Sequence, residues 1–108
     1  MKKVNVLGTE YMIESRKKDG DPNLNNCDGY CDDSVKLCVV EDFEVSDGCK
    51  GNLNAYSNTV MRHELIHAFL SESGLSNSSD WAVNEEIVDW IALQFPKLLK
   101  AFEQADAL

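Results

Sequence analysis

Basic residues are few in this chain, and no cluster of them is present. Lysine and arginine number 10 against 19 aspartates and glutamates, which gives a formal net charge of -9. The longest basic run, residues 16–18, is followed at once by Asp19. Proteins that bind nucleic acid contact its phosphates through clustered lysine and arginine side chains. We therefore expect no nucleic-acid partner.

Long hydrophobic runs are also missing. No segment approaches the roughly 18 consecutive apolar residues of a membrane-spanning helix. The charged start at residues 1–3 leads into no apolar run of signal-peptide length. We expect no membrane partner and a cytoplasmic location. The four cysteines fit that location as reduced thiols; they are Cys27, Cys31, Cys38 and Cys49.

The spacing of the cysteines leaves their state open. Cys27 and Cys31 are separated by three residues, a spacing that a structural zinc site permits, but the wider spacing of Cys38 and Cys49 matches no zinc finger. Unligated thiols, one or more disulfides and a second metal site all remain compatible with the pattern. Cys31 and Cys38 flank a predicted turn, which would make them cross-strand neighbours without a bond between them.

The chain has the length of one small domain, residues 1–108, with two differently patterned parts. Residues 1–51 alternate short β-like segments with turn formers and predict hairpins at 4–15 and 29–40. Residues 52–108 are helical in pattern. We expect an α+β fold in which a small, mainly antiparallel twisted sheet packs on helices.

Residues 54–73 predict the first helix, with Asn52 or Asn54 as its N-cap and Gly74 as a left-handed stop. A second helix is expected to open at Trp81 or Ala82 and to end at Phe95, where Pro96 begins a third helix reaching residue 105. Large aromatic side chains recur along these C-terminal helices, and we expect them to pack in the core; they are Trp81, Trp90, Phe95 and Phe102.

The most specific motif is His-Glu-Leu-Ile-His at residues 63–67, which contains the only two histidines of the chain. On a helix, His63 and His67 stand one turn apart on the same face, close enough to share a metal ion. Glu64 would then lie where it can deprotonate a metal-bound water. This H-E-x-x-H pattern is typical of zinc peptidases, and we expect zinc as the cofactor.

A catalytic zinc needs a third protein ligand and one open position. Glu85 and Asp89 are four residues apart on the next predicted helix. The first can bind the metal while the second accepts the other ring N–H of a ligating histidine. Glu86 is not excluded by spacing alone, and a cysteine is a further alternative to Glu85.

Together, H-E-x-x-H and the following Asn84-Glu85-x-x-x-Asp89 resemble the zincins whose third ligand is glutamate, the thermolysin-type arrangement. The short chain resembles the minimal zincin-like peptidases of the ImmA/IrrE type, which are common in bacterial mobile elements and prophages. The resemblance lies in residues 61–90. It implies a small twisted sheet packed on the active-site helix. It also implies that His63, His67 and Glu85 hold zinc, that Glu64 is the general base, and that Asp89 accepts a hydrogen bond from a ligating histidine.

Three features depart from known zincins. Position 70 is leucine and no third histidine exists, which excludes the metzincins. The chain is much shorter than thermolysin-like enzymes, so their substrate subsites do not carry over. The ImmA/IrrE-type enzymes often work beside a DNA-binding partner or domain, and residues 1–108 include no DNA-binding domain.

The predicted reaction is hydrolysis of a peptide bond in a protein or peptide substrate. Tyr30, Tyr56 and Arg62 are the available donors for the oxyanion, and the hairpin at 30–40 is the candidate edge for an extended substrate. A rival hypothesis is a non-catalytic interaction module in which zinc joins two helices. An acidic protein that binds a basic partner is a third hypothesis, but it leaves the motif unexplained. Nothing in the sequence predicts the oligomeric state.

Overall fold

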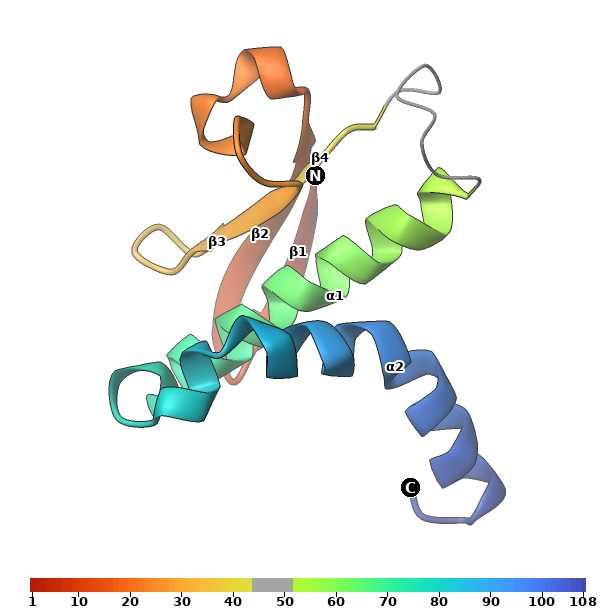
Figure 1. The fold of residues 1–108 in the computed structure, drawn as a ribbon. Coiled ribbons are helices and arrows are strands. Elements are labelled where there is room, and N and C mark those ends of the chain that lie inside the picture. Colours follow the sequence, from red (N-terminus) through yellow and green to blue (C-terminus); the bar gives the residue numbers. More distant parts are fainter. Residues whose placement is uncertain (44–51) are drawn as a thin grey trace.

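The computed structural model describes residues 1–43 and 52–108, which form the expected α+β fold. One long helix packs on a four-stranded sheet, and a second long helix packs against the first (Figure 1). The strands are β1 (Lys2–Val6), β2 (Thr9–Arg16), β3 (Gly29–Asp32) and β4 (Leu37–Glu41). The helices are α1 (Leu53–Glu72) and α2 (Glu85–Gln104). Most of the loop expected at residues 46–52 lies outside the described residues.

The sheet is mixed, with the strand order β1-β2-β4-β3. Both predicted hairpins are confirmed, since β1 pairs antiparallel with β2 and β3 pairs antiparallel with β4. The expectation of a mainly antiparallel sheet missed the central pairing, in which β2 and β4 run parallel. This pairing arises because the segment between β2 and β3 carries the chain past β4 to the far edge, and β4 then returns between them.

The first hairpin turns tightly because two adjacent residues adopt positive φ angles. Leu7 has φ 51° and Gly8 has φ 93°, and the side-chain oxygen of Asn5 accepts a hydrogen bond from the Gly8 amide at 2.9 Å. Two consecutive positive φ angles match the right-handed twist of paired strands. The turn thereby fixes the register in which Val6 pairs with Thr9.

One face of the sheet is covered by α1. Side chains alternate between the two faces of a strand, so residues two apart share a face. A buried cluster forms where this face meets α1; it consists of Val6, Tyr11, Ile13, Cys38 and Ala68. This cluster holds α1 in place across the strands.

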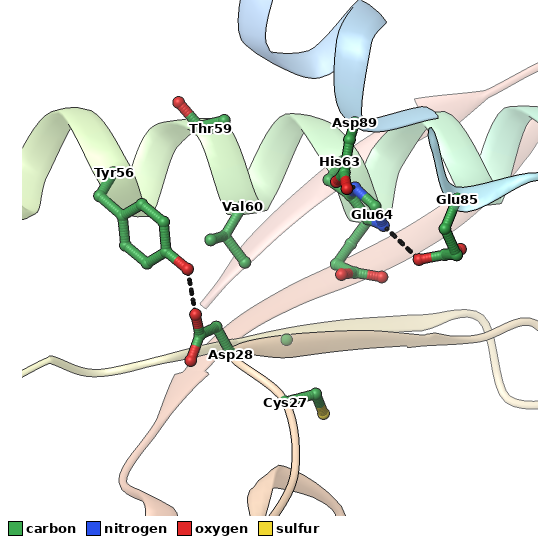
Figure 2. Close-up of a pocket in the computed structure, with 10 residues that line it drawn as sticks. Cys27, Asp28, Tyr56, Thr59, Val60, His63, Glu64, Glu85 and Asp89 are labelled. Atoms are coloured by element: carbon green, nitrogen blue, oxygen red, sulfur yellow. Dashed lines mark hydrogen bonds and ion pairs between the residues drawn. The ribbon is translucent and has the colours of Figure 1, made fainter. Parts of the chain in front are cut away.

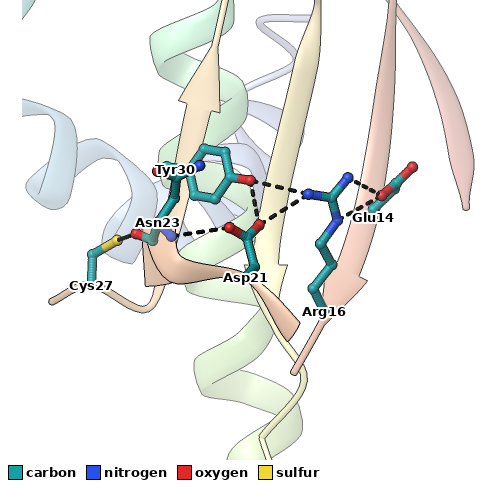
Figure 3. Close-up of polar contacts among 6 residues, drawn as sticks. All are labelled: Glu14, Arg16, Asp21, Asn23, Cys27 and Tyr30. Carbon is teal, nitrogen blue, oxygen red and sulfur yellow. Dashed lines mark hydrogen bonds and ion pairs between the residues drawn. The ribbon is translucent and has the colours of Figure 1, made fainter. Parts of the chain in front are cut away.

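The segment between β2 and β3 is fixed by the nearly buried carboxylate of Asp21 (Figure 3). Asp21 accepts hydrogen bonds from Arg16 at 3.0 Å, from the Tyr30 hydroxyl at 2.5 Å and from the Asn23 amide at 3.0 Å. The Tyr30 hydroxyl, followed by the other two donors, holds the pKa of Asp21 below its usual range. Arg16 also donates to Glu14. This network ties the loop to the ends of β2 and β3.

The caps of α1 are confirmed, whereas the boundaries expected for the later helices are wrong. The Asn52 side chain accepts from the Ala55 amide at 3.1 Å, and Gly74 has φ 83°. A short 3-10 turn, η5 (Asp80–Val83), contains the expected helix start. The α-helix begins at Glu85, after the N-cap Asn84. It continues through Pro96 to Gln104, so no separate third helix forms.

Pro96 lies inside α2 because its missing hydrogen bond is replaced from α1. A proline has no N–H to offer the carbonyl four residues earlier, which here belongs to Ala92. Arg62 of α1 donates to this carbonyl from Nε at 2.7 Å, and its Nη2 donates to Thr59. The helix bends along its length and its C-terminal part extends away from the sheet (Figure 1). Arg62 therefore joins the two helices at the position of the proline.

The aromatic side chains of the C-terminal region do not enter the core as expected. Trp81, Trp90, Phe95 and Phe102 are 44%, 56%, 43% and 44% exposed. Along α2 only Val88 and Ala92 are buried, because α1 covers a narrower stripe than the apolar surface of the helix. Within the described ranges, no helix combines the length and apolar character needed to cross a membrane.

Gly29 allows β3 to approach α1 closely. A Cβ atom at this position would lie 2.8 Å from the Val39 carbonyl oxygen, 2.8 Å from Cγ1 of Val60 and 3.3 Å from Cγ of Glu64. The first of these neighbours is backbone, which cannot rotate aside. Only glycine therefore fits between β4 and α1 here.

We predict that Gly29→Ala lowers the free energy of unfolding by about 1–3 kcal/mol, because the added methyl group overpacks the interface between strand and helix. Urea unfolding followed by circular dichroism measures the change. Gly20→Ala is the matched control, since a Cβ at position 20 meets nothing within 4 Å. Equal stability of the two variants would contradict the close packing at Gly29.

Candidate metal centre

His63 and His67 meet on one face of α1. Their Nε2 atoms lie 3.1 Å apart, and their rings are 4.7 Å apart between centroids. The 3.6-residue helical repeat places side chains four residues apart above one another, which is why the motif brings both nitrogens to one point. Burial lowers the pKa of His67 and so favours its neutral form, the form that binds metals.

Glu85, in the first turn of α2, supplies the third group. Its Oε2 lies 3.1 Å from Nε2 of His63, and its Oε1 lies 2.6 Å from Nε2 of His67. Two ligands of a tetrahedral zinc with bonds of about 2.0–2.1 Å lie about 3.3 Å apart. These separations therefore fit one small divalent ion held by His63, His67 and Glu85, which together form a possible ligand group.

Asp89 contacts the other side of the His63 ring. Its Oδ1 lies 2.6 Å from Nδ1 of His63, one helical turn beyond Glu85 on α2. A carboxylate at this distance accepts a hydrogen bond from the Nδ1–H group, which leaves the lone pair on Nε2 pointing at the shared centre. The structure therefore brings Asp89 to the place expected of a residue that orients a ligand.

Glu64 is buried beside these groups. Only 6% of the residue is exposed, and among the described residues no side-chain oxygen is both fully buried and without a hydrogen-bond partner. Burial raises the pKa of Glu64 to about 7. A carboxyl group that is largely removed from water is costly to ionise, so it holds its proton more tightly than an exposed glutamate does.

Two clefts meet at this carboxylate. One has a volume of about 240 Å³ and extends toward Asp28 and Tyr56 (Figure 2), and the other, of about 360 Å³, extends toward Cys31 and Ser76. Both are lined by His63, Glu64, Glu85 and Gly29. The candidate centre thus lies in the middle of a longer depression between α1, β3 and the start of α2.

The three side chains expected to stabilise an oxyanion are all engaged elsewhere. The Tyr30 hydroxyl donates to Asp21, and Arg62 donates to the backbone of α2. The Tyr56 hydroxyl donates to Asp28 in the wall of the smaller cleft (Figure 2). The structure therefore selects none of them for this role.

Some features of the site were not predicted from the sequence. Gly29 and Asp28 line the smaller cleft, but their stretch of turn-forming residues indicated only a loop. Glu86, the alternative ligand, lines a separate depression with Ile87 and Trp90. The described cysteines, Cys27, Cys31 and Cys38, are free thiols, and none belongs to the ligand group; Cys49 lies outside the described residues.

Comparison with known proteins leaves the site to be judged on its own geometry. No protein-family model, no curated protein and no solved structure matches this chain.

We predict that Glu85→Gln weakens zinc binding far more than Glu86→Gln, because only Glu85 points at the histidine nitrogens. Asp89→Asn should weaken binding by about 10- to 100-fold, the usual effect of losing the partner of a ligating histidine. Competition titration with a chromophoric chelator measures all three affinities. An equal loss in the Glu85 and Glu86 variants would contradict the assignment.

We also predict that Glu64→Gln stabilises the metal-free protein at alkaline pH by about 1–3 kcal/mol. The raised pKa of Glu64 means that the folded protein holds this proton more tightly than the unfolded chain does. The stabilisation that comes from binding this proton is therefore fully present below the ordinary glutamate pKa and is lost as the pH rises through about 7.

Urea unfolding in the presence of a chelator, at pH 4.5 and pH 8, measures this difference. The gap between Glu64→Gln and wild type should widen from the lower to the higher pH, while Glu86→Gln should follow wild type at both. A gap independent of pH would show that burial does not raise the pKa of Glu64.

Proposed function

We propose that this protein is a zinc-dependent metallopeptidase of minimal zincin type. The observation that carries the proposal is the largely buried Glu64 side chain, which lines both clefts beside the converging ligand atoms of His63, His67 and Glu85. His63, His67 and Glu85 would hold the ion, and Asp89 would orient His63. The free thiols among the described cysteines support a cytoplasmic location for this activity.

Zinc, when bound, would lower the pKa of a water molecule toward about 7 and polarise the carbonyl of the scissile bond. Glu64 takes the proton of the attacking water as the bond to the carbonyl carbon forms. It then passes this proton to the leaving amine. The raised pKa of Glu64 supports both transfers, because a general base works best when its pKa lies near the working pH.

An extended peptide would bind along β3. This strand is at the edge of the sheet. Just before it, the carbonyl oxygen of Asp28 accepts a hydrogen bond from the Glu41 amide at 2.8 Å, so these two residues form a hydrogen-bonded pair. In an antiparallel ladder the bonding direction alternates, so the main-chain groups of Gly29 and Cys31 point away from β4. A substrate strand added at this edge would cross the centre between the two clefts.

The same observations weigh against the rival function, in which zinc only joins α1 to α2. A structural zinc site usually has four protein ligands, whereas the group here offers three and opens into clefts. A module of that kind also has no use for the buried carboxylate of Glu64. The three-ligand centre therefore favours catalysis.

We predict that Glu64→Gln keeps zinc and the fold but abolishes peptide cleavage, because glutamine cannot accept the proton of the water. The zinc-loaded protein is incubated with a peptide library prepared from digested bacterial proteins, and new chain ends are identified by mass spectrometry. Glu86→Gln is the matched control and should cleave the same bonds as wild type.

Cleavage that persists in the Glu64 variant would contradict the assigned base. Absence of any cleavage by zinc-loaded wild type across the library would instead favour the interaction module.

A further inference from the structure

Cys31 and Cys38 face each other across the hairpin of β3 and β4. Because Asp28 and Glu41 form a hydrogen-bonded pair, the alternation of the ladder makes Cys31 and Cys38 a non-hydrogen-bonded pair. The Cα atoms of such a pair lie about 4.5 Å apart. This value is within the range of about 4.4–6.8 Å that a disulfide spans. The register therefore places the two cysteines directly opposite each other, at a backbone separation that a disulfide can span.

The two thiols differ in their access to solvent. Cys31 is partly exposed and lines the larger cleft next to His63, His67 and Glu64, whereas Cys38 is completely buried. The Cys38 thiol donates to the backbone carbonyl of Glu64 across 3.6 Å. One thiol can therefore meet a reagent in the cleft, while its neighbour is held against the helical turn that carries the candidate base.

We propose that Cys31 and Cys38 form a redox pair that peroxide converts reversibly into a cross-strand disulfide. The Cys31 sulfur attacks hydrogen peroxide, the O–O bond breaks, and a sulfenic acid forms at Cys31 with release of water. The Cys38 sulfur then attacks that sulfur, the S–O bond breaks, and a second water leaves. The two thiols lose two electrons and two protons, and the peroxide is reduced to two water molecules.

The environment of Cys31 fits the attacking role. The neighbouring Cys38 thiol is the largest influence on Cys31 and lowers its pKa, while the same neighbour relation and burial raise the pKa of Cys38. A partly exposed thiol with a buried neighbour is the arrangement of an attacking and a resolving cysteine. Oxidation would also remove the S–H donor that Cys38 offers to the Glu64 carbonyl.

The test uses the full chain carrying Cys27→Ser and Cys49→Ser, so that the proposed pair is all that remains. The protein is treated with hydrogen peroxide near equimolar amounts, and its intact mass and peptide map are recorded before and after a thiol reductant. We expect the monomer to lose the mass of two hydrogen atoms, a linked peptide to join Cys31 to Cys38, and the reductant to reverse both changes.

The matched control adds Cys38→Ser to this chain. It should form no internal link, and its Cys31 should instead be trapped by a sulfenic-acid reagent. Gain of oxygen atoms without the link in the chain that retains the pair would overturn the proposal, as would no reaction at all. These readouts need neither zinc nor peptide cleavage, so they are independent of the proposed function.

Discussion

The close approach of β3 to α1 at Gly29 is the constraint on which the other features of this protein depend. Because no side chain separates the strand from the helix there, the Glu64 carboxylate is enclosed between them, next to the nitrogens of His63 and His67. The same approach leaves the outward-facing backbone of the edge strand beside the two clefts. Removal of a carboxylate from water opposes folding, and the apolar cluster formed by α1 and the sheet offsets that cost.

The second constraint is the packing of α2 on α1. Asn84 starts α2 so that Glu85 faces both histidines and Asp89, one turn later, faces the opposite nitrogen of His63. Further along, Arg62 donates a hydrogen bond to the Ala92 carbonyl, which receives none from Pro96, so the helix continues past the proline. The position of Glu85, the candidate third ligand, is therefore fixed by contacts on both sides of the histidine pair.

Much of the site and part of the fold follow from local sequence. The spacing of His63 and His67 fixes their relation on any helix, and the turn formers define both hairpins and the caps of α1. Less predictable were the features that need contacts distant in sequence. The parallel pairing of β2 with β4 depends on how two hairpins meet, and the continuity of α2 depends on an arginine from another helix. Burial of the aromatic residues was predicted wrongly because periodicity shows an apolar face but not the width that a neighbour covers.

The proposed zinc ion would bind between α1 and α2 through two imidazoles and a carboxylate. X-ray absorption at the zinc edge, on the full chain loaded with one equivalent of zinc, identifies the atoms that hold it. We expect only nitrogen and oxygen neighbours at about 2.0–2.2 Å, with the outer-shell scattering of two imidazole rings. Sulfur neighbours at about 2.3 Å would place the metal on the cysteines and contradict this proposal.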